Sequence, residues 1–498
     1  MNQSNQELFN LIHSLTKSEQ RYFKLFIKNL GAKSTNYERL FKAIAQQKEY
    51  DEHKIRRKFR GEKLLSNLSA SKQYLQGIIL KALRNYHSEK TIDDTILDGI
   101  RTLKILNNKG LFSLLKKEIE RLEKLARTYH RSFYLPVILY WKHTTQYALL
   151  FDKKVNSIEQ FEAIVEEIPA SVEALELGLR QFVDLLHLKF NYQKTGIVQP
   201  NVGTLLPKSD GFVENLTYLN KQIEKDLYVH NWLGALESNK KALQLLEQDN
   251  KRLTTVSEWQ DSYHAILTTS IFVASNGVFV QDFYEFTQTY DALPTESVAP
   301  IFQIFAQSSK MIFYRKTGRV AEGKALLENI QIFLKKHTEL ANNNFIPVIY
   351  FNTGIIYLFD KEYDKALELL QNSASILKKQ KAYPELYLAT FVIEMIIFYE
   401  KKEFLFLDSL IQAFVRKLNK TEPLFDYWKL LVTLFKLLNR QEHNLEEIQP
   451  SLMAIKEQLK DFHEEQHLLR YFIFIDWIES LVSEKEMLQV VQLQVVGN

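Results

Sequence analysis

The sequence predicts an all-α fold, a solenoid of helical hairpins preceded by a basic helical module. The first observation is a scarcity of turn formers, with 15 Gly and 10 Pro among 498 residues, against average usages of about 7% and 5%. The second is that apolar residues recur at helical spacing, whereas the alternation typical of strands is almost absent. Hydrophobic residues make up 46% of the chain and aromatic residues 12%, which excludes a disordered protein.

The helical pattern divides the chain into segments. Gly and Pro crowd residues 193–212, and helices do not cross such a stretch. We therefore predict four parts: a basic helical module over 1–90, helical hairpins over 91–195, a loop or linker over 196–211, and a repeat array with a C-terminal cap over 212–498. The apolar tail Leu488–Val496 is β-prone, and we expect it to belong to that cap.

An internal period marks the C-terminal half. Three segments share the same internal spacings, and their tyrosines Tyr314, Tyr357 and Tyr399 recur after 43 and 42 residues. Each segment has the pattern of an aromatic-tailed helix, a short polar turn and a second helix. The turns are Arg315–Arg319, Asp360–Glu362 and Lys401–Glu403. Because one hairpin cannot bury its apolar face alone, the fixed period predicts stacked hairpins.

The middle segment carries a family resemblance. Asn352-Thr-Gly-Ile-Ile-Tyr357 is followed by Tyr363, Ala366, Leu370 and Ala374 at intervals of six, three, four and four residues. This pattern resembles a tetratricopeptide repeat (TPR), and a weaker copy begins at Trp232. The resemblance implies that Ala366 and Ala374 lie where paired helices cross closely. It is confined to the C-terminal half, and Gly323 and Asp408, at the position of Ala366 in the neighbouring segments, depart from the pattern.

The resemblance also implies that the first helix of each hairpin lines a concave face. It places a candidate groove at Ile312, Arg315, Phe351, Ile355, Leu358, Ile393, Ile397 and Glu400. An apolar groove either takes an amphipathic helix or apolar peptide from a partner, or is filled by the protein's own tight superhelix. The expected partner is a protein or peptide whose identity the sequence does not give.

The net charge of +4 conceals an asymmetry. Residues 17–90 carry 18 Lys and Arg against 7 Asp and Glu, whereas the remainder carries 46 against 53. The densest cluster, the candidate basic patch, consists of Lys54, Arg56, Arg57, Lys58, Arg60 and Lys63. Such a patch attracts nucleic acid or an acidic protein surface, and it also occurs as a solvated helix face, here facing the acidic remainder of the same chain.

Cysteine content and hydropathy indicate the cellular compartment of the protein. The chain has no Cys, which removes disulfides, thiolate nucleophiles and Cys-ligated metals and fits a reducing compartment. Its longest apolar stretches, such as Leu430–Leu438, are far shorter than the ~20 residues needed to span a bilayer. The first residues show no basic stretch followed by an apolar one, so no export signal is indicated. We expect a cytoplasmic protein without membrane association.

One motif in the sequence, H-E-x-x-H, is typical of a zinc site. His463, Glu464 and His467 form H-E-x-x-H, in which two His on one helix face bind zinc and the Glu serves as general base. Here Asp461 and Glu465 crowd the motif with charge, and no third ligand follows at a recognisable spacing. We interpret the motif as a chance match and expect neither a metal nor a cofactor. Phosphate-binding loops and nucleophile motifs are also absent from the sequence.

These observations favour a non-catalytic cytosolic scaffold that binds a protein through its helical array. The alternative is a nucleic-acid-binding regulator, in which Tyr37–Gln47, Asp51–Phe59 and Leu68–Tyr86 form a helical DNA-binding module and the array senses a peptide or protein. No helix-turn-helix signature is recognisable there, so the sequence places nucleic acid second. A zinc metalloprotease is the remote alternative.

The sequence predicts that the purified protein holds no stoichiometric zinc, because H-E-x-x-H lacks a third protein ligand. Elemental analysis checks this, and Glu464→Gln should leave any biological activity unchanged. One zinc per chain that is lost in His463→Ala would instead place the protein among the metalloenzymes.

Overall fold

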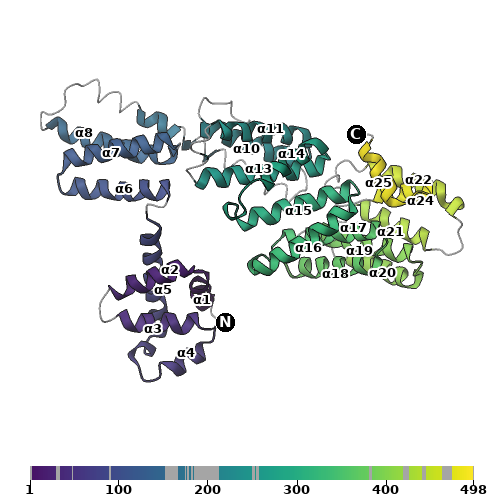
Figure 1. The fold of residues 1–498 in the computed structure, drawn as a ribbon, viewed down its shortest axis with the longest axis horizontal. Coiled ribbons are helices and arrows are strands. Elements are labelled where there is room, and N and C mark those ends of the chain that lie inside the picture. Colours follow the sequence, from purple (N-terminus) through teal and green to yellow (C-terminus); the bar gives the residue numbers. More distant parts are fainter. Residues whose placement is uncertain are drawn as a thin grey trace. The chain divides into compact units, whose positions relative to one another are not determined.

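The computed structural model is helical throughout the part of the chain that it describes (Figure 1). The described residues are 3–29, 34–47, 49–88, 91–129, 131–151, 167–173, 175–176, 179–180, 183, 212–248, 253, 257–341, 343–380, 384–418, 426–439, 445–461 and 474–496. No strand occurs among them, which confirms the predicted all-α fold. No helix within these ranges combines the length and the apolar character that crossing a membrane requires.

The chain divides into two compact units, Met1–Glu176 and Leu177–Asn498. This division falls before the stretch that is rich in Gly and Pro. The linker predicted over 196–211 lies outside the described residues.

The first helices of unit 1 surround a core of their own. They are α1 (Gln3–Ser14), α2 (Lys17–Lys28), α3 (Ser34–Ala45), α4 (Glu52–Lys58) and α5 (Leu68–His87), with a short 3₁₀ turn, η1 (Lys63–Leu65). Each of the five α-helices contributes a fully buried side chain to this core, and the contributors include Ile12, Phe23, Phe41, Ile55 and Ile79. We call residues 3–88 the N-terminal module.

A second core follows in the same unit. It forms between α6 (Ile92–Asn108), α7 (Phe112–Thr128) and α8 (Leu135–Phe151). Leu103, Leu115, Leu122 and Ile138 are buried within it. Gly99 lies where α6 meets α7, and a Cβ atom there would come within 2.3 Å of Leu122 Cδ2, so this glycine permits the close approach of the two helices.

Unit 2 is a succession of helical hairpins. Its described helices are α10 (Phe212–Tyr228), α11 (Trp232–Glu247), α13 (Ser257–Gly277), α14 (Val280–Asp291), α15 (Pro300–Lys316), α16 (Val320–Lys336), α17 (Phe345–Phe359), α18 (Tyr363–Gln380), α19 (Pro384–Glu400), α20 (Phe404–Leu418), α21 (Asp426–Leu438), α22 (Leu445–Asp461), α24 (Phe474–Ser483) and α25 (Met487–Val496). The first helices of successive hairpins pack on one another, α13 on α15, α15 on α17 and α17 on α19. This consecutive packing fits a helical solenoid.

The turn inside each hairpin from α10 to α20 has one conformation. The first or second residue after the first helix has a positive φ, between 56° and 65°, at His230, Val278, Gly318, Lys361 and Lys402. The next residue donates its backbone N–H to the carbonyl five positions back, over 2.8–3.0 Å; Asn231 donates to Asp226 and Glu362 to Tyr357. This bond is the mark of a Schellman turn, which ends a helix and satisfies its last carbonyls. The three turns predicted from the sequence period are therefore confirmed as helix breaks.

The crossing of α17 and α18 is as close as the sequence predicts. Ala366 is fully buried, and a Cβ atom on Gly354 would lie 3.3 Å from the Ala366 carbonyl oxygen and 3.0 Å from Leu370 Cγ. Gly323, at the matching position of the preceding hairpin, is also buried, and a Cβ atom there would come within 2.5 Å of Ile356 Cδ1. Asp408 is exposed on α20. The departure at Gly323 thus preserves a tight crossing, whereas the one at Asp408 leaves the position open.

Replacing Ala366 with Leu should lower the free energy of unfolding by about 1–3 kcal/mol, because the extra methylene groups overpack the crossing of α17 and α18. Chemical denaturation monitored by circular dichroism measures this. Asp408→Leu is the matched control and should change stability by less, since its side chain is exposed. Equal effects at the two positions would contradict the close crossing.

Candidate interaction surfaces

The residues predicted to line the groove are buried. Exposed fractions are 0% for Phe351, Ile355, Ile393 and Ile397, and Ile312, Arg315 and Leu358 are also buried. These seven side chains therefore form part of the core of unit 2, and they do not line an open groove. The second possibility left by the sequence, a groove filled by the protein itself, describes this arrangement.

The C-terminal hairpin, α24 and α25, packs against the ends of several earlier helices. Trp477, on α24, is fully buried and donates its indole Nε1–H to Glu400 Oε1 at the end of α19, over 2.8 Å. Its ring stacks on Phe435 of α21 at 5.4 Å between centroids and meets Tyr399 edge-on at 5.5 Å. Glu400, which the sequence placed in the groove, is thus a partner of the chain's own C-terminal segment.

The same hairpin reaches the turns of two earlier hairpins. Gln492 Nε2, on α25, donates to the Gly318 carbonyl at 3.2 Å, and Glu486 pairs with Lys361 at 2.7 Å. At Gly318 a Cβ atom would lie 2.8 Å from Leu488 Cδ1, so a larger residue there would push α25 away. The C-terminal hairpin therefore ties together hairpins that are more than a hundred residues distant in the sequence.

The C-terminal hairpin also brings the charge of Asp476, on α24, near that of Arg315. Arg315, on α15, is almost wholly buried, and burial lowers the pKa of its guanidinium to about 10, an effect that the nearby Asp476 opposes. Burial also raises the pKa of Asp476, while a hydrogen bond from Gln494 and the charge of Arg315 act in the other direction. Arg315 still carries its charge at neutral pH because its pKa remains far above 7.

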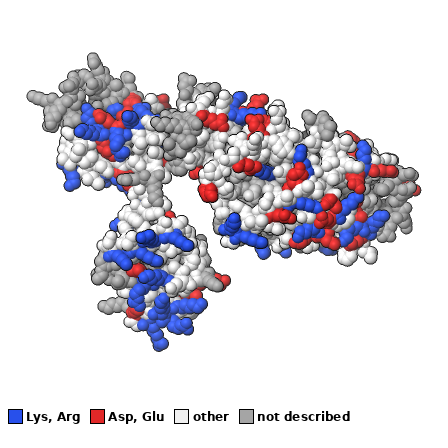
Figure 2. Space-filling model, viewed as in Figure 1, with Lys and Arg blue, Asp and Glu red and all other residues white. Residues whose placement is uncertain are grey.

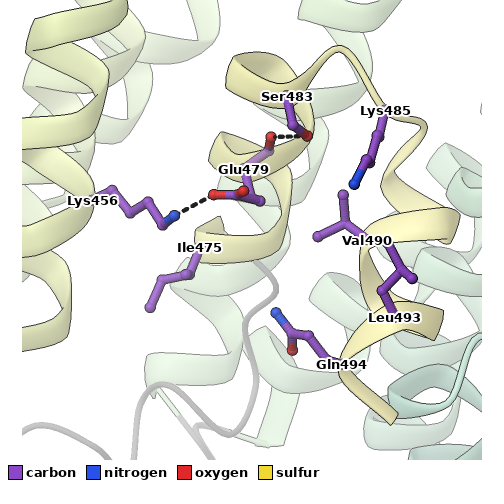
Figure 3. Close-up of a pocket in the computed structure, with 8 residues that line it drawn as sticks. All are labelled: Lys456, Ile475, Glu479, Ser483, Lys485, Val490, Leu493 and Gln494. Carbon is purple, nitrogen blue, oxygen red and sulfur yellow. Dashed lines mark hydrogen bonds and ion pairs between the residues drawn. The ribbon is translucent and has the colours of Figure 1, made fainter. Parts of the chain in front are cut away.

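A cavity of about 350 Å³ lies between α22 and the C-terminal hairpin (Figure 3). Its lining residues are Lys456, Ile475, Glu479, Ser483, Lys485, Val490, Leu493 and Gln494. Lys456 is paired with Glu479, and the Ser483 hydroxyl donates to the Glu479 carbonyl at 2.7 Å. Two of the polar side chains that line the cavity, those of Lys456 and Ser483, are therefore engaged with Glu479.

The H-E-x-x-H motif, His463 to His467, lies outside the described residues. Within the described ranges, no group of three or more His, Asp or Glu side chains is placed to hold a metal ion. The prediction about zinc therefore stays a prediction.

Part of the candidate basic patch is neutralised by neighbouring carboxylates. Lys54 pairs with Asp51 at 3.6 Å, and Arg56 pairs with Glu52 at 2.7 Å. Arg57, Lys58 and Arg60 are exposed, and none of them makes an ion pair within the described residues. Lys63 begins η1, and its side chain lies outside the described part.

A search of the sequence for the densest run of basic residues misses a second set of cations, which lies on α2. Lys17, Arg21, Lys24 and Lys28 follow one another at intervals of four, three and four residues, so they share one face of the helix. Lys24 is half-buried and the other three are exposed. We call these four the α2 basic stripe. Its signal was present in the sequence as a helical spacing of basic residues.

The chain matches no protein-family model, and no curated protein or solved structure is detectably similar to it.

Trp477→Ala should lower the free energy of unfolding of unit 2 by about 3–5 kcal/mol, because it removes a fully buried ring from the contact between α24 and the array. Trp477→Phe should cost less, since it keeps an aromatic ring near Phe435 and loses only the hydrogen bond to Glu400. Leu493→Ala, at an exposed position of α25, is the control and should be nearly neutral. If Trp477→Ala matched this control, the C-terminal hairpin would not be part of the core.

Proposed function

We propose that the protein is a non-catalytic scaffold whose TPR-like array binds another protein. The observation that supports this most directly is the run of stacked hairpins with one recurring turn, because such arrays present extended surfaces to partners. The tight crossing at Gly354 and Ala366 supports the likeness to TPR hairpins. The absence of Cys is compatible with the cytosol, where we place the scaffold.

We propose that the partner binds the surface at α20, since the residues predicted to line a groove are buried. Leu405 and Phe406 lie in the first turn of this helix, and their exposed fractions are 84% and 63%. Phe398 of α19 stacks on Phe406 at 5.8 Å, which holds the ring in place. A large aromatic side chain that is both exposed and held in position suits a contact at the centre of a protein interface.

The test is affinity capture from the native host after chemical crosslinking, with the full chain as bait. Leu405→Ser combined with Phe406→Ser should lose a stoichiometric protein partner by more than about tenfold, a loss typical of interface hot spots. Ile332→Ser, at another exposed apolar position on α16, is the matched control and should retain the partner. Retention of the partner by the double variant, or capture of no stoichiometric protein, would overturn the proposal.

A further inference from the structure

The N-terminal module uses many of its carboxylates internally. Glu19 pairs with His87, Glu38 with Lys42, Asp51 with Lys54, Glu62 with Arg39, and Glu52 with both Arg56 and Lys72. Glu19 and Asp51 also accept backbone N–H groups at helix N-termini, which lowers the pKa of both and keeps them ionised. These acids are therefore not available to neutralise the remaining cations of the module.

The remaining cations lie on three parts of the module. Within the described residues, the following make no ion pair: Lys17, Arg21, Lys24 and Lys28 on α2, Lys81 and Arg84 on α5, and Arg57, Lys58 and Arg60 on or just after α4. Lys24 and Lys28 act on Glu38 at longer range, and they help to lower the pKa of its carboxyl group, whose ion pair is with Lys42. Figure 2 shows Lys and Arg spread over the face of the module that carries α2, α3 and α4 in Figure 1, with few Asp and Glu among them.

The α2 basic stripe lies on a rigid element. Thr16 and Glu19 form a reciprocal capping box that fixes the start of α2. Phe23 and Ile27 anchor its other face in the core, and Tyr22 contacts Tyr86 of α5 at 5.2 Å between ring centroids. From Lys17 to Lys28 the helix rises by roughly 16 Å, at about 1.5 Å per residue. The four cations therefore form a preorganised row.

A row of this length suits a duplex. Duplex DNA carries one phosphate charge per about 1.7 Å of its axis, counting both strands, so a row of roughly 16 Å lies beside several phosphates. Three of its four members are Lys, which binds phosphate well as a point charge but is depleted at the centres of protein–protein interfaces. The composition of the stripe therefore favours a nucleic acid over an acidic protein as its partner.

We propose that the N-terminal module binds the phosphate backbone of a duplex nucleic acid through the α2 basic stripe, with Arg57, Lys58 and Arg60 as a second contact. The contact recognises the charge and the spacing of the backbone phosphates, and it requires no base-specific hydrogen bond. It does not depend on the scaffold proposed for unit 2, because it involves other residues.

The test uses the full-length protein and a fluorescently labelled duplex, either DNA or RNA of the same sequence, in anisotropy titrations over a series of salt concentrations. Binding to the wild-type chain should weaken steeply as salt rises, by about 0.9 in the log–log slope for each phosphate neutralised. Replacing Lys17, Arg21, Lys24 and Lys28 together with Gln should reduce the slope by up to about 3.6 and weaken binding more than about tenfold near physiological salt. The DNA and RNA arms show which duplex is preferred, and binding to either supports the proposal.

A matched control separates the stripe from net charge alone. Gln in place of Lys104, Lys116, Lys117 and Lys124, which are exposed on α6 and α7, removes the same four charges and should leave the slope nearly unchanged. Circular dichroism verifies that both variants are folded. Equal losses in the two variants, no binding by the wild-type chain, or tighter binding of polyglutamate than of the duplex at equal charge concentration would each overturn the proposal, and the last would favour an acidic protein surface as the partner.

Discussion

Each described hairpin from α10 to α20 depends on one left-handed residue at its turn. That residue lets the chain reverse within three positions, and the backbone bond across it satisfies a carbonyl that the helix end would otherwise leave unpaired. Glycine occupies this position only at Gly318; His230, Lys361 and Lys402 adopt the same conformation, as does the β-branched Val278. Such a conformation costs of order 1–3 kcal/mol for a residue with a side chain, so packing of the paired helices must hold it in place.

A second contribution to the stack comes from the C-terminal hairpin. It places Trp477 against α19 and α21 and joins Gln492 to the Gly318 carbonyl. The left-handed turn at Gly318 and the contact with α25 therefore meet at one residue, where a side chain would disturb both. Leu405 and Phe406 of α20 stay exposed in this arrangement and form the surface proposed for the partner.

The surface of the N-terminal module is determined by its charges. Its apolar core is satisfied internally, and several carboxylates cap helices or pair with neighbouring cations, so the charge left on its surface is positive. The α2 basic stripe is rigid because the opposite face of the same helix is buried. Together with the scaffold proposed for unit 2, this would make the chain an adaptor that brings a protein to a nucleic acid.

The sequence by itself determined the helical class, the turns after Tyr314, Tyr357 and Tyr399 and the basic excess before residue 90, because helical periodicity, turn residues and charge are local properties. It missed the hairpin at Val278, where the left-handed position follows Gly277 and is itself occupied by a β-branched residue. It also assigned Phe351 and Ile393 to a groove, since their apolar character is equally suited to a binding face and a core. Only the tertiary structure decided between these two, because the packing of helices from several hairpins buries both side chains completely. The β-prone segment with Val490 and Val491 is helical in the structure, because burial of one helix face outweighs the weak local preference for a strand.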